Sequence, residues 1–199
     1  MTRSSKGKRG YNPREVATRE IKQTFLIVCE GSKTEPNYFR GFRFPGLVIE
    51  IKGLAVSPVQ LVAEANQLVQ GKEYDQVWCV FDRDDWPIDN FTGALSKARA
   101  KGIKVAYTNE AFELWYLLHF NYHDTAIGRE KYKAKLTENL GKTYFKNDPT
   151  IYSTLKAKTD TAIHNAKRLF AQYEPPNPAE DNPSTTVHLL VEQLLRFSR

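Results

Sequence analysis

Two uninterrupted apolar runs constrain the fold of this 199-residue chain more than any other feature. The first, TFLIVC, covers residues 24–29, and the second lies inside DQVWCVFD at 75–82. Both are short and rich in β-branched or aromatic residues, which is typical of strands buried on both faces. The chain must therefore supply apolar helices to cover both sides of a sheet.

Helical and strand patterns alternate through the first half of the chain. LVIEIKG at 47–53 alternates apolar and charged residues and predicts a half-exposed edge strand, while IKVAYT at 103–108 predicts a fourth strand. Helices are expected at 36–42, at 57–71 with capping signals at both ends, and near 91–101. This alternation predicts an α/β fold with a mostly parallel four-stranded sheet and helices on both faces.

The second half is mainly helical. EAFELWYLLHF at 110–120 is apolar nearly all round and predicts a buried helix, and further helices are expected near 156–172 and at 184–197. The Lys- and Tyr-rich segment at 129–146 is ambiguous. This half is expected to form a helical annex rather than an independent domain.

We therefore divide the chain into an arm at 1–23, an α/β core at 24–125 and an annex at 126–199 that packs on the core. The arm is basic: residues 1–22 hold seven Lys or Arg against two Glu, which is +5 of the net charge of +6. One interpretation is a solvated, flexible tail. The other is an arm that grips a polyanion such as nucleic acid.

Location is expected to be cytoplasmic, away from any membrane. No apolar stretch approaches the length that crosses a bilayer, and the basic N-terminal segment is not followed by the apolar region of a secretory signal. Cys29 and Cys79 each lie inside an apolar run, so we expect buried thiols of a reducing compartment rather than a zinc site.

Acidic residues follow the two most apolar strands. Glu30 ends the first, and Asp82 ends the third, with Asp84 two residues on. Ligands of open α/β sheets bind outside the carboxyl ends of the strands, so these side chains are expected to meet there. Glu35, directly before Pro36, is expected at a helix N-cap position. Glu is a poor cap, which indicates a different role.

Carboxylates gathered at one point repel one another unless a cation neutralises them. Oxygen ligands favour a hard divalent ion, Mg²⁺ or Mn²⁺. Glu113 is a lone acid within an apolar helix and also needs a partner or a cation. His119 and His123 lack further ligands in the sequence and are interpreted as structural.

Four motifs in order carry a resemblance that spans residues 25 to 195: IVCEGSKTEPNYF, VFDRDD, NEAFELWYLLHF and NPSTTVHLLVEQL. Together they resemble the RloB-like family. A Glu-Gly after the first strand and an Asp-x-Asp after a later one are similar to the Toprim domain of topoisomerases, primases and overcoming-lysogenization-defect (OLD) nucleases. The resemblance implies a Toprim/Rossmann-like core and a prokaryotic defence setting.

The resemblance also implies roles for individual acids. Glu30 matches the Toprim glutamate, a metal ligand or general acid/base, and Asp82 and Asp84 match the metal-holding pair. Glu35 matches a second acid of OLD-type nucleases, with one spacer residue more than the tightest form. Glu113 is expected to complete a second metal position.

The leading hypothesis is a nuclease that uses Mg²⁺ or Mn²⁺. The ion lowers the pKa of a bound water and neutralises phosphoryl charge, while Glu113 or Glu35 orients or deprotonates the water. The candidate phosphate contacts are Lys33, Lys52, Arg83, Lys156, Lys158, Ser184 and Thr185. For the last two, a plain N-cap role stands beside phosphate binding.

Other functions remain open from the sequence. No tyrosine stands out as a topoisomerase nucleophile, and no nucleotide-binding annex indicates a primase. The alternative is a non-catalytic subunit that binds nucleic acid or a protein partner within a restriction or defence complex. The candidate partners are DNA or RNA, tRNA included, and an ATPase or other defence subunit; the sequence does not choose between DNA and RNA.

Overall fold

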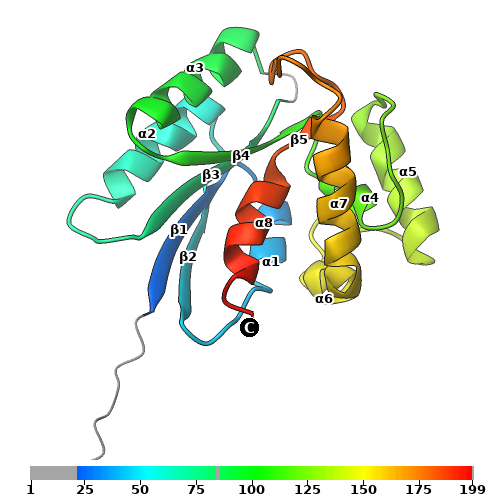
Figure 1. Cartoon of the computed structure of the whole chain (residues 1–199), viewed down its shortest axis with the longest axis horizontal. Coiled ribbons are helices and arrows are strands. Elements are labelled where there is room, and N and C mark those ends of the chain that lie inside the picture. The colour runs from blue at the N-terminus through cyan, green and yellow to red at the C-terminus, as the bar shows by residue number, and fades with distance from the viewer. Residues whose placement is uncertain (1–21, 84–85, 199) are drawn as a thin grey trace, which may run out of the picture.

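A five-stranded sheet lies at the centre of the computed structural model, which describes residues 22–83 and 86–198 (Figure 1). Its order is β2-β1-β3-β4-β5, and β1 to β4 run parallel while β5 is antiparallel to β4. The strands are β1 (Gln23–Cys29), β2 (Leu47–Gly53), β3 (Gln76–Asp82), β4 (Lys104–Asn109) and β5 (Ser184–Thr185). The four predicted strands are confirmed, and β2 lies at the predicted edge. The predicted count of four strands is wrong.

The extra strand, β5, replaces the first turn of a predicted helix. Ser184 and Thr185 pair with Asn109 and Thr108 of β4, and helix α8 begins only afterwards (Val187–Leu195). The hydroxyl of Thr185 donates to the carbonyl oxygen of Tyr107 at 3.1 Å. These contacts join residues more than seventy positions apart, so a local pattern does not reveal them.

The side chains of β1 divide the core into two layers. Phe25, Ile27 and Cys29 face one apolar cluster, and Leu26 and Val28 face the other. Helices α2 (Pro58–Leu68) and α3 (Ile88–Ala100) cover the second cluster, while α1 (Thr34–Phe39), α4 (Glu113–Leu118) and α8 belong to the first (Figure 1). The predicted burial of β1 on both faces is confirmed.

The remaining helical segments come next, and each α-helix among them contributes buried residues to the first cluster. They are α5 (Arg129–Leu140), α6 (Ile151–Leu155), the 3-10 turn η1 (Lys156–Lys158) and α7 (Thr159–Phe170). All six residues of α4 are buried, because α5 and α7 pack against this helix. Side chains of β1 and of α5 to α8 share one apolar cluster, so the segment predicted as an annex is continuous with the core.

Helix starts show where local signals succeed and fail. At α2, the amide of Ser57 donates to the side-chain oxygen of Gln60 at 3.3 Å, which confirms the predicted capping box. At α1, the helix begins at Thr34, so Glu35 lies in its first turn. The predicted N-cap position of Glu35 is therefore wrong, and Lys33 occupies it instead.

Two further sequence predictions concern cysteines and membranes. Cys29 and Cys79 are buried free thiols, as predicted. No helix in the described part of the chain has the length and apolar character needed to cross a bilayer. The predicted basic arm lies outside the described residues, except for its last two positions, of which Gln23 begins β1.

The packing of α3 generates a stability prediction. Phe91 is fully buried, and its ring packs edge-on against Phe81 and Tyr107 at centroid distances of 5.6 and 5.7 Å. We expect Phe91→Ala to lower the free energy of unfolding by about 3–5 kcal/mol, because it leaves a cavity between α3 and the sheet. Ile88 on the same helix is 44% exposed, so Ile88→Ala should cost less than about 1 kcal/mol. Urea denaturation measures both, and equal losses would contradict this packing.

Candidate functional site

A pocket of about 380 Å³ opens where β1 and β3 end. This is the edge at which the sequence predicted a site. The pocket lining contains four acidic residues from four different elements or their ends: Glu30, Glu35, Asp82 and Glu113. Further lining residues are Gly31, Ser32, Lys33, Thr34, Ala55, Val56, Trp86, Phe112, Arg129, Lys146 and Asn147.

Glu30 ties the ends of the two central strands together. One carboxylate oxygen, Oε2, accepts a hydrogen bond from the amide of Asp82 at 3.0 Å. The other, Oε1, accepts from the indole Nε1 of Trp86 at 2.6 Å. The side chain that leaves β1 is thereby fixed across the carboxyl end of β3.

Glu35 comes from the first turn of α1 and is only 4% exposed. Its Oε1 accepts from the amide of Gly31 at 3.2 Å, and its buried Oε2 has no hydrogen-bond partner among the described residues. Burial, together with the nearby acids Glu113 and Glu30, raises the pKa of Glu35 to about 7. A Cβ at Gly31 would overlap the Glu35 carboxylate, so a larger residue here would displace that side chain.

Asp82 ends β3 and faces the same pocket. Its Oδ2 accepts from the amide of Phe112 at 3.1 Å, while Oδ1 is buried and without a hydrogen-bond partner in the part of the chain that the structure describes. Burial raises the pKa of Asp82 well above its usual range, and so do the acids Glu35, Glu30 and Glu113. The predicted second member of this motif, Asp84, lies outside the described residues.

Glu113 begins α4 and is 5% exposed. The hydroxyl of Tyr144 donates to its Oε1 at 3.2 Å, and the Nζ of Lys146 lies 3.9 Å from the same oxygen. The expectation that this buried acid needs a partner is met by two residues that the sequence did not single out.

The surroundings of the four acids show whether the pocket is suited to a cation. Among the described residues, two buried carboxylate oxygens lack donors, and the neighbouring acids raise the pKa of Glu35 and of Asp82, so a positive ion would relieve both costs. Within residues 22–83 and 86–198, no group of three or more His, Cys, Asp or Glu is arranged to hold a metal ion. Mg²⁺ keeps several waters and commonly takes only one or two protein carboxylates together with substrate phosphate, so the donor set suits this ion.

The predicted cationic contacts fall in different places. Lys33 is exposed and lines the pocket. Lys52 pairs with Glu50 on β2 at 3.3 Å, and Arg83 donates to the carbonyl oxygens of Trp86 and Ala179. Neither of these two lines the pocket.

Two further predicted lysines lie on η1. Lys156 is exposed, and the Nζ of Lys158 lies 4.3 Å from the centroid of the Phe120 ring. Neither belongs to the pocket lining. Of the five predicted cations, the structure therefore brings only Lys33 to the acids.

Ser184 and Thr185 do not form the predicted phosphate contact at a helix start. Both are 0% exposed. Ser184 Oγ donates to the carbonyl oxygen of Asp181 at 2.8 Å, and Thr185 Oγ1 is bonded to Tyr107 within the sheet. Their hydroxyls hold β5 in place, and no phosphate in solvent can reach them.

The two histidines lie away from the acids. His119 is buried, its Nδ1 donates to the carbonyl oxygen of Trp115 at 2.9 Å, and burial lowers its pKa to about 4. His123 is partly buried, which also lowers its pKa. Both therefore remain neutral at pH 7, in keeping with a structural role.

Several site residues were missed by sequence reasoning. Trp86 lies two residues beyond the Asp-x-Asp motif, and its indole donates a hydrogen bond to Glu30. Tyr144 and Lys146 belong to the segment at 129–146 that the sequence left ambiguous, thirty or more positions beyond Glu113, and Asn147 follows it directly. No spacing rule links them to the acids, because tertiary packing brings them there.

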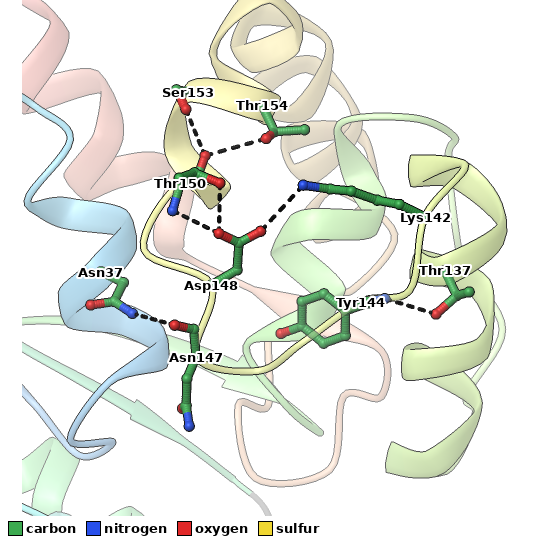
Figure 2. Close-up of polar contacts among 9 residues, drawn as sticks. All are labelled: Asn37, Thr137, Lys142, Tyr144, Asn147, Asp148, Thr150, Ser153 and Thr154. Atoms are coloured by element: carbon green, nitrogen blue, oxygen red, sulfur yellow. Dashed lines mark hydrogen bonds and ion pairs between the residues drawn. The ribbon is translucent and has the colours of Figure 1, made fainter.

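Hydrogen bonds from α1 hold this later segment beside the pocket. Thr34 Oγ1 donates to the carbonyl oxygen of Lys146 at 3.1 Å, and Asn37 Nδ2 donates to that of Asn147 at 3.1 Å. Figure 2 shows Asn37 reaching the Asn147 backbone from the neighbouring helix. The first and second halves of the chain thus build the pocket together.

A comparison with protein families decides which family this is. A family model described as RloB-like protein matches residues 25–194. The chain belongs to the RloB-like family. The match includes all four acids of the pocket, which confirms the family suggested by the sequence motifs. No curated protein and no solved structure matches the chain.

The raised pKa of Glu35 predicts a pH-dependent stability in metal-free protein. An acid whose pKa rises from 4.5 to about 7 on folding contributes stability below pH 4.5 that is lost as pH rises through 7. Glu35→Gln keeps the acceptor for Gly31 and removes that loss. At pH 8 we expect the variant to melt several degrees above the wild type, because its free energy of unfolding is higher by at most about 3 kcal/mol. At pH 4.5 the two proteins should melt at nearly the same temperature.

Thermal melts at the two pH values, in chelator, measure this difference. Glu64→Gln on the exposed surface of α2 is the matched control and should show no such pH dependence. An equal offset for Glu35→Gln at both pH values would contradict the raised pKa.

Proposed function

We propose that this RloB-like protein is a metal-dependent nuclease that hydrolyses phosphodiester bonds of DNA or RNA in a prokaryotic defence system. The observation that carries the proposal is the meeting of Glu30, Glu35, Asp82 and Glu113 in one pocket at the carboxyl end of the sheet. Acids that repel one another in a buried pocket persist where a cation or a proton compensates them.

Mg²⁺ or Mn²⁺ would be held by Asp82 and Glu35, each of which has a buried oxygen without a donor among the described residues, together with Glu30. Asp84 is a further proposed ligand from the sequence motif and lies outside the described residues. When bound, such an ion lowers the pKa of a water and neutralises charge on phosphoryl oxygens. This arrangement follows the Toprim type that the motifs resemble.

The protein's own groups supply the rest of the chemistry. Glu113, held by Tyr144 and Lys146, is fixed in position to orient or deprotonate the attacking water. Glu35 is the second candidate base, because its carboxylate lies in the same pocket as Asp82 and Glu113. Lys33 and Lys146 line the pocket and are suited to contact the phosphate.

The setting is part of the proposal. Two buried free thiols suit the reducing cytoplasm. The partners that we propose are a nucleic acid, tRNA included, and an ATPase or another defence subunit.

A second function is favoured by one observation. Most carboxylate oxygens of the pocket already accept hydrogen bonds from the protein, and the described residues contain no set of three metal ligands. Acids that are held by hydrogen bonds within the protein, without a bound metal, are compatible with a non-catalytic subunit that binds nucleic acid or a protein partner. The experiment below separates the two.

Purified protein is incubated with labelled single- and double-stranded DNA and RNA in Mg²⁺, Mn²⁺ or chelator. We expect divalent-dependent cleavage that falls by at least about 100-fold in Asp82→Asn and in Glu30→Gln, because each removes a carboxylate from the site. The matched control is Asp89→Asn, an exposed acid in the first turn of α3.

Cleavage that both site variants retain would overturn the proposed site. Binding of nucleic acid without cleavage, across all substrates and ions, would favour the non-catalytic function.

A further inference from the structure

Phe145 stands out on the surface because of where it lies. It is 67% exposed, and it is the only aromatic among the exposed large hydrophobic residues that the structure describes. Single exposed apolar residues are common on protein surfaces and need no explanation by themselves. Phe145, however, directly precedes Lys146 and Asn147 in the wall of the acidic pocket.

The loop at residues 141–150 holds Phe145 in place. Asp148 accepts hydrogen bonds from the Nζ of Lys142 at 3.4 Å and from the amide of Thr150 at 2.7 Å (Figure 2). At the other end, the amide of Tyr144 donates to Thr137 Oγ1 of α5 at 3.1 Å. A loop fixed in this way presents an aromatic ring without a large loss of chain entropy on binding.

The two neighbours of Phe145 show which way its ring points. Tyr144 and Lys146 both reach the same oxygen of Glu113, so both side chains point into the site. Phe145 lies between them in the chain and is exposed, so its ring faces solvent next to a residue of the pocket wall. Consecutive Cα atoms are about 3.8 Å apart, so the exposed ring and the pocket-lining Lys146 leave the backbone at neighbouring points of the same loop.

An aromatic face beside a lysine at a phosphodiester site matches one nucleotide unit. The ring offers a stacking surface to a base, and the ammonium offers a contact to the adjoining phosphate. Paired bases are stacked inside a duplex and cannot use such a surface, whereas an unpaired base can.

We propose that the 141–150 loop selects single-stranded nucleic acid, with Phe145 stacking on an unpaired base and Lys146 contacting its phosphate. This inference rests on the proposed function, because it assigns a substrate class to the same pocket. Phe145 is a specificity-determining residue in this account, and it takes no part in bond cleavage.

The test measures binding rather than cleavage. Labelled dT12 and U12 strands, and hairpin duplexes of DNA and RNA of equal length, are titrated with full-length protein in chelator, and fluorescence anisotropy gives Kd. We expect single strands to bind more tightly than duplexes. Phe145→Ala should weaken single-strand binding by about 5- to 100-fold, and Phe145→Trp should retain it.

Two further variants show what kind of contact is made, and two others serve as controls. Phe145→Leu keeps an apolar side chain without a π-face and should behave like Phe145→Ala. Lys146→Ala should reduce the slope of log K against log salt by about 0.7, the loss of one phosphate contact on a single strand. Leu189→Ala and Lys97→Ala alter an exposed apolar residue and an exposed lysine elsewhere, and both should bind as the wild type does.

The outcomes separate this inference from the proposed function. If divalent-dependent cleavage is lost in Asp82→Asn but Phe145→Ala binds every strand as the wild type does, the inference fails and the nuclease stands. If Phe145 is needed for single-strand binding but no cleavage is found, the inference stands and the nuclease fails. Equal affinity of Phe145→Leu and wild type would overturn stacking and indicate a merely apolar contact. The DNA and RNA strands show which sugar the loop accepts.

Discussion

The close approach of carboxylates at the ends of β1 and β3 is the constraint on which the rest of the site depends. Parallel strands that are neighbours in a sheet bring the residues after them to one edge, whatever their charge. The protein reduces the resulting repulsion locally: Glu30 accepts from the Asp82 amide and the Trp86 indole, and Glu35 accepts from Gly31. Two buried oxygens remain without donors among the described residues. Burying a carboxylate oxygen without a partner is costly, and this cost is the physical argument for a cation.

The second half of the chain completes the pocket and does more than cover the sheet. The 141–150 loop supplies Tyr144 and Lys146 to Glu113, and α1 holds the backbone of the same loop through Thr34 and Asn37. The helix that carries Glu35 and the loop that carries Lys146 are therefore fixed to each other. A substitution that moves the helix or the loop should therefore also shift the acids, since the helix carries Glu35 and the loop contacts Glu113.

Much of the fold was predictable because its causes are local. The apolar runs of β1 and β3, the alternation in β2 and the capping box of α2 each follow from residues close together in sequence. The meeting of Glu30 with Asp82 was also predictable, since it follows from strand direction. The Glu35 N-cap prediction failed locally, whereas two other failures have long-range causes. The two-residue strand β5 exists only because it pairs with β4, and Tyr144 reaches Glu113 only through tertiary packing.

The central claim is that one divalent ion sits among these acids. The most direct measurement is anomalous diffraction at the manganese edge from crystals soaked in Mn²⁺. The account predicts a peak at about coordination distance, 2.0–2.5 Å, from carboxylate oxygens of Asp82 and of Glu35 or Glu30. A saturating soak that leaves this pocket without a peak, or that places Mn²⁺ only on acids elsewhere, would contradict it.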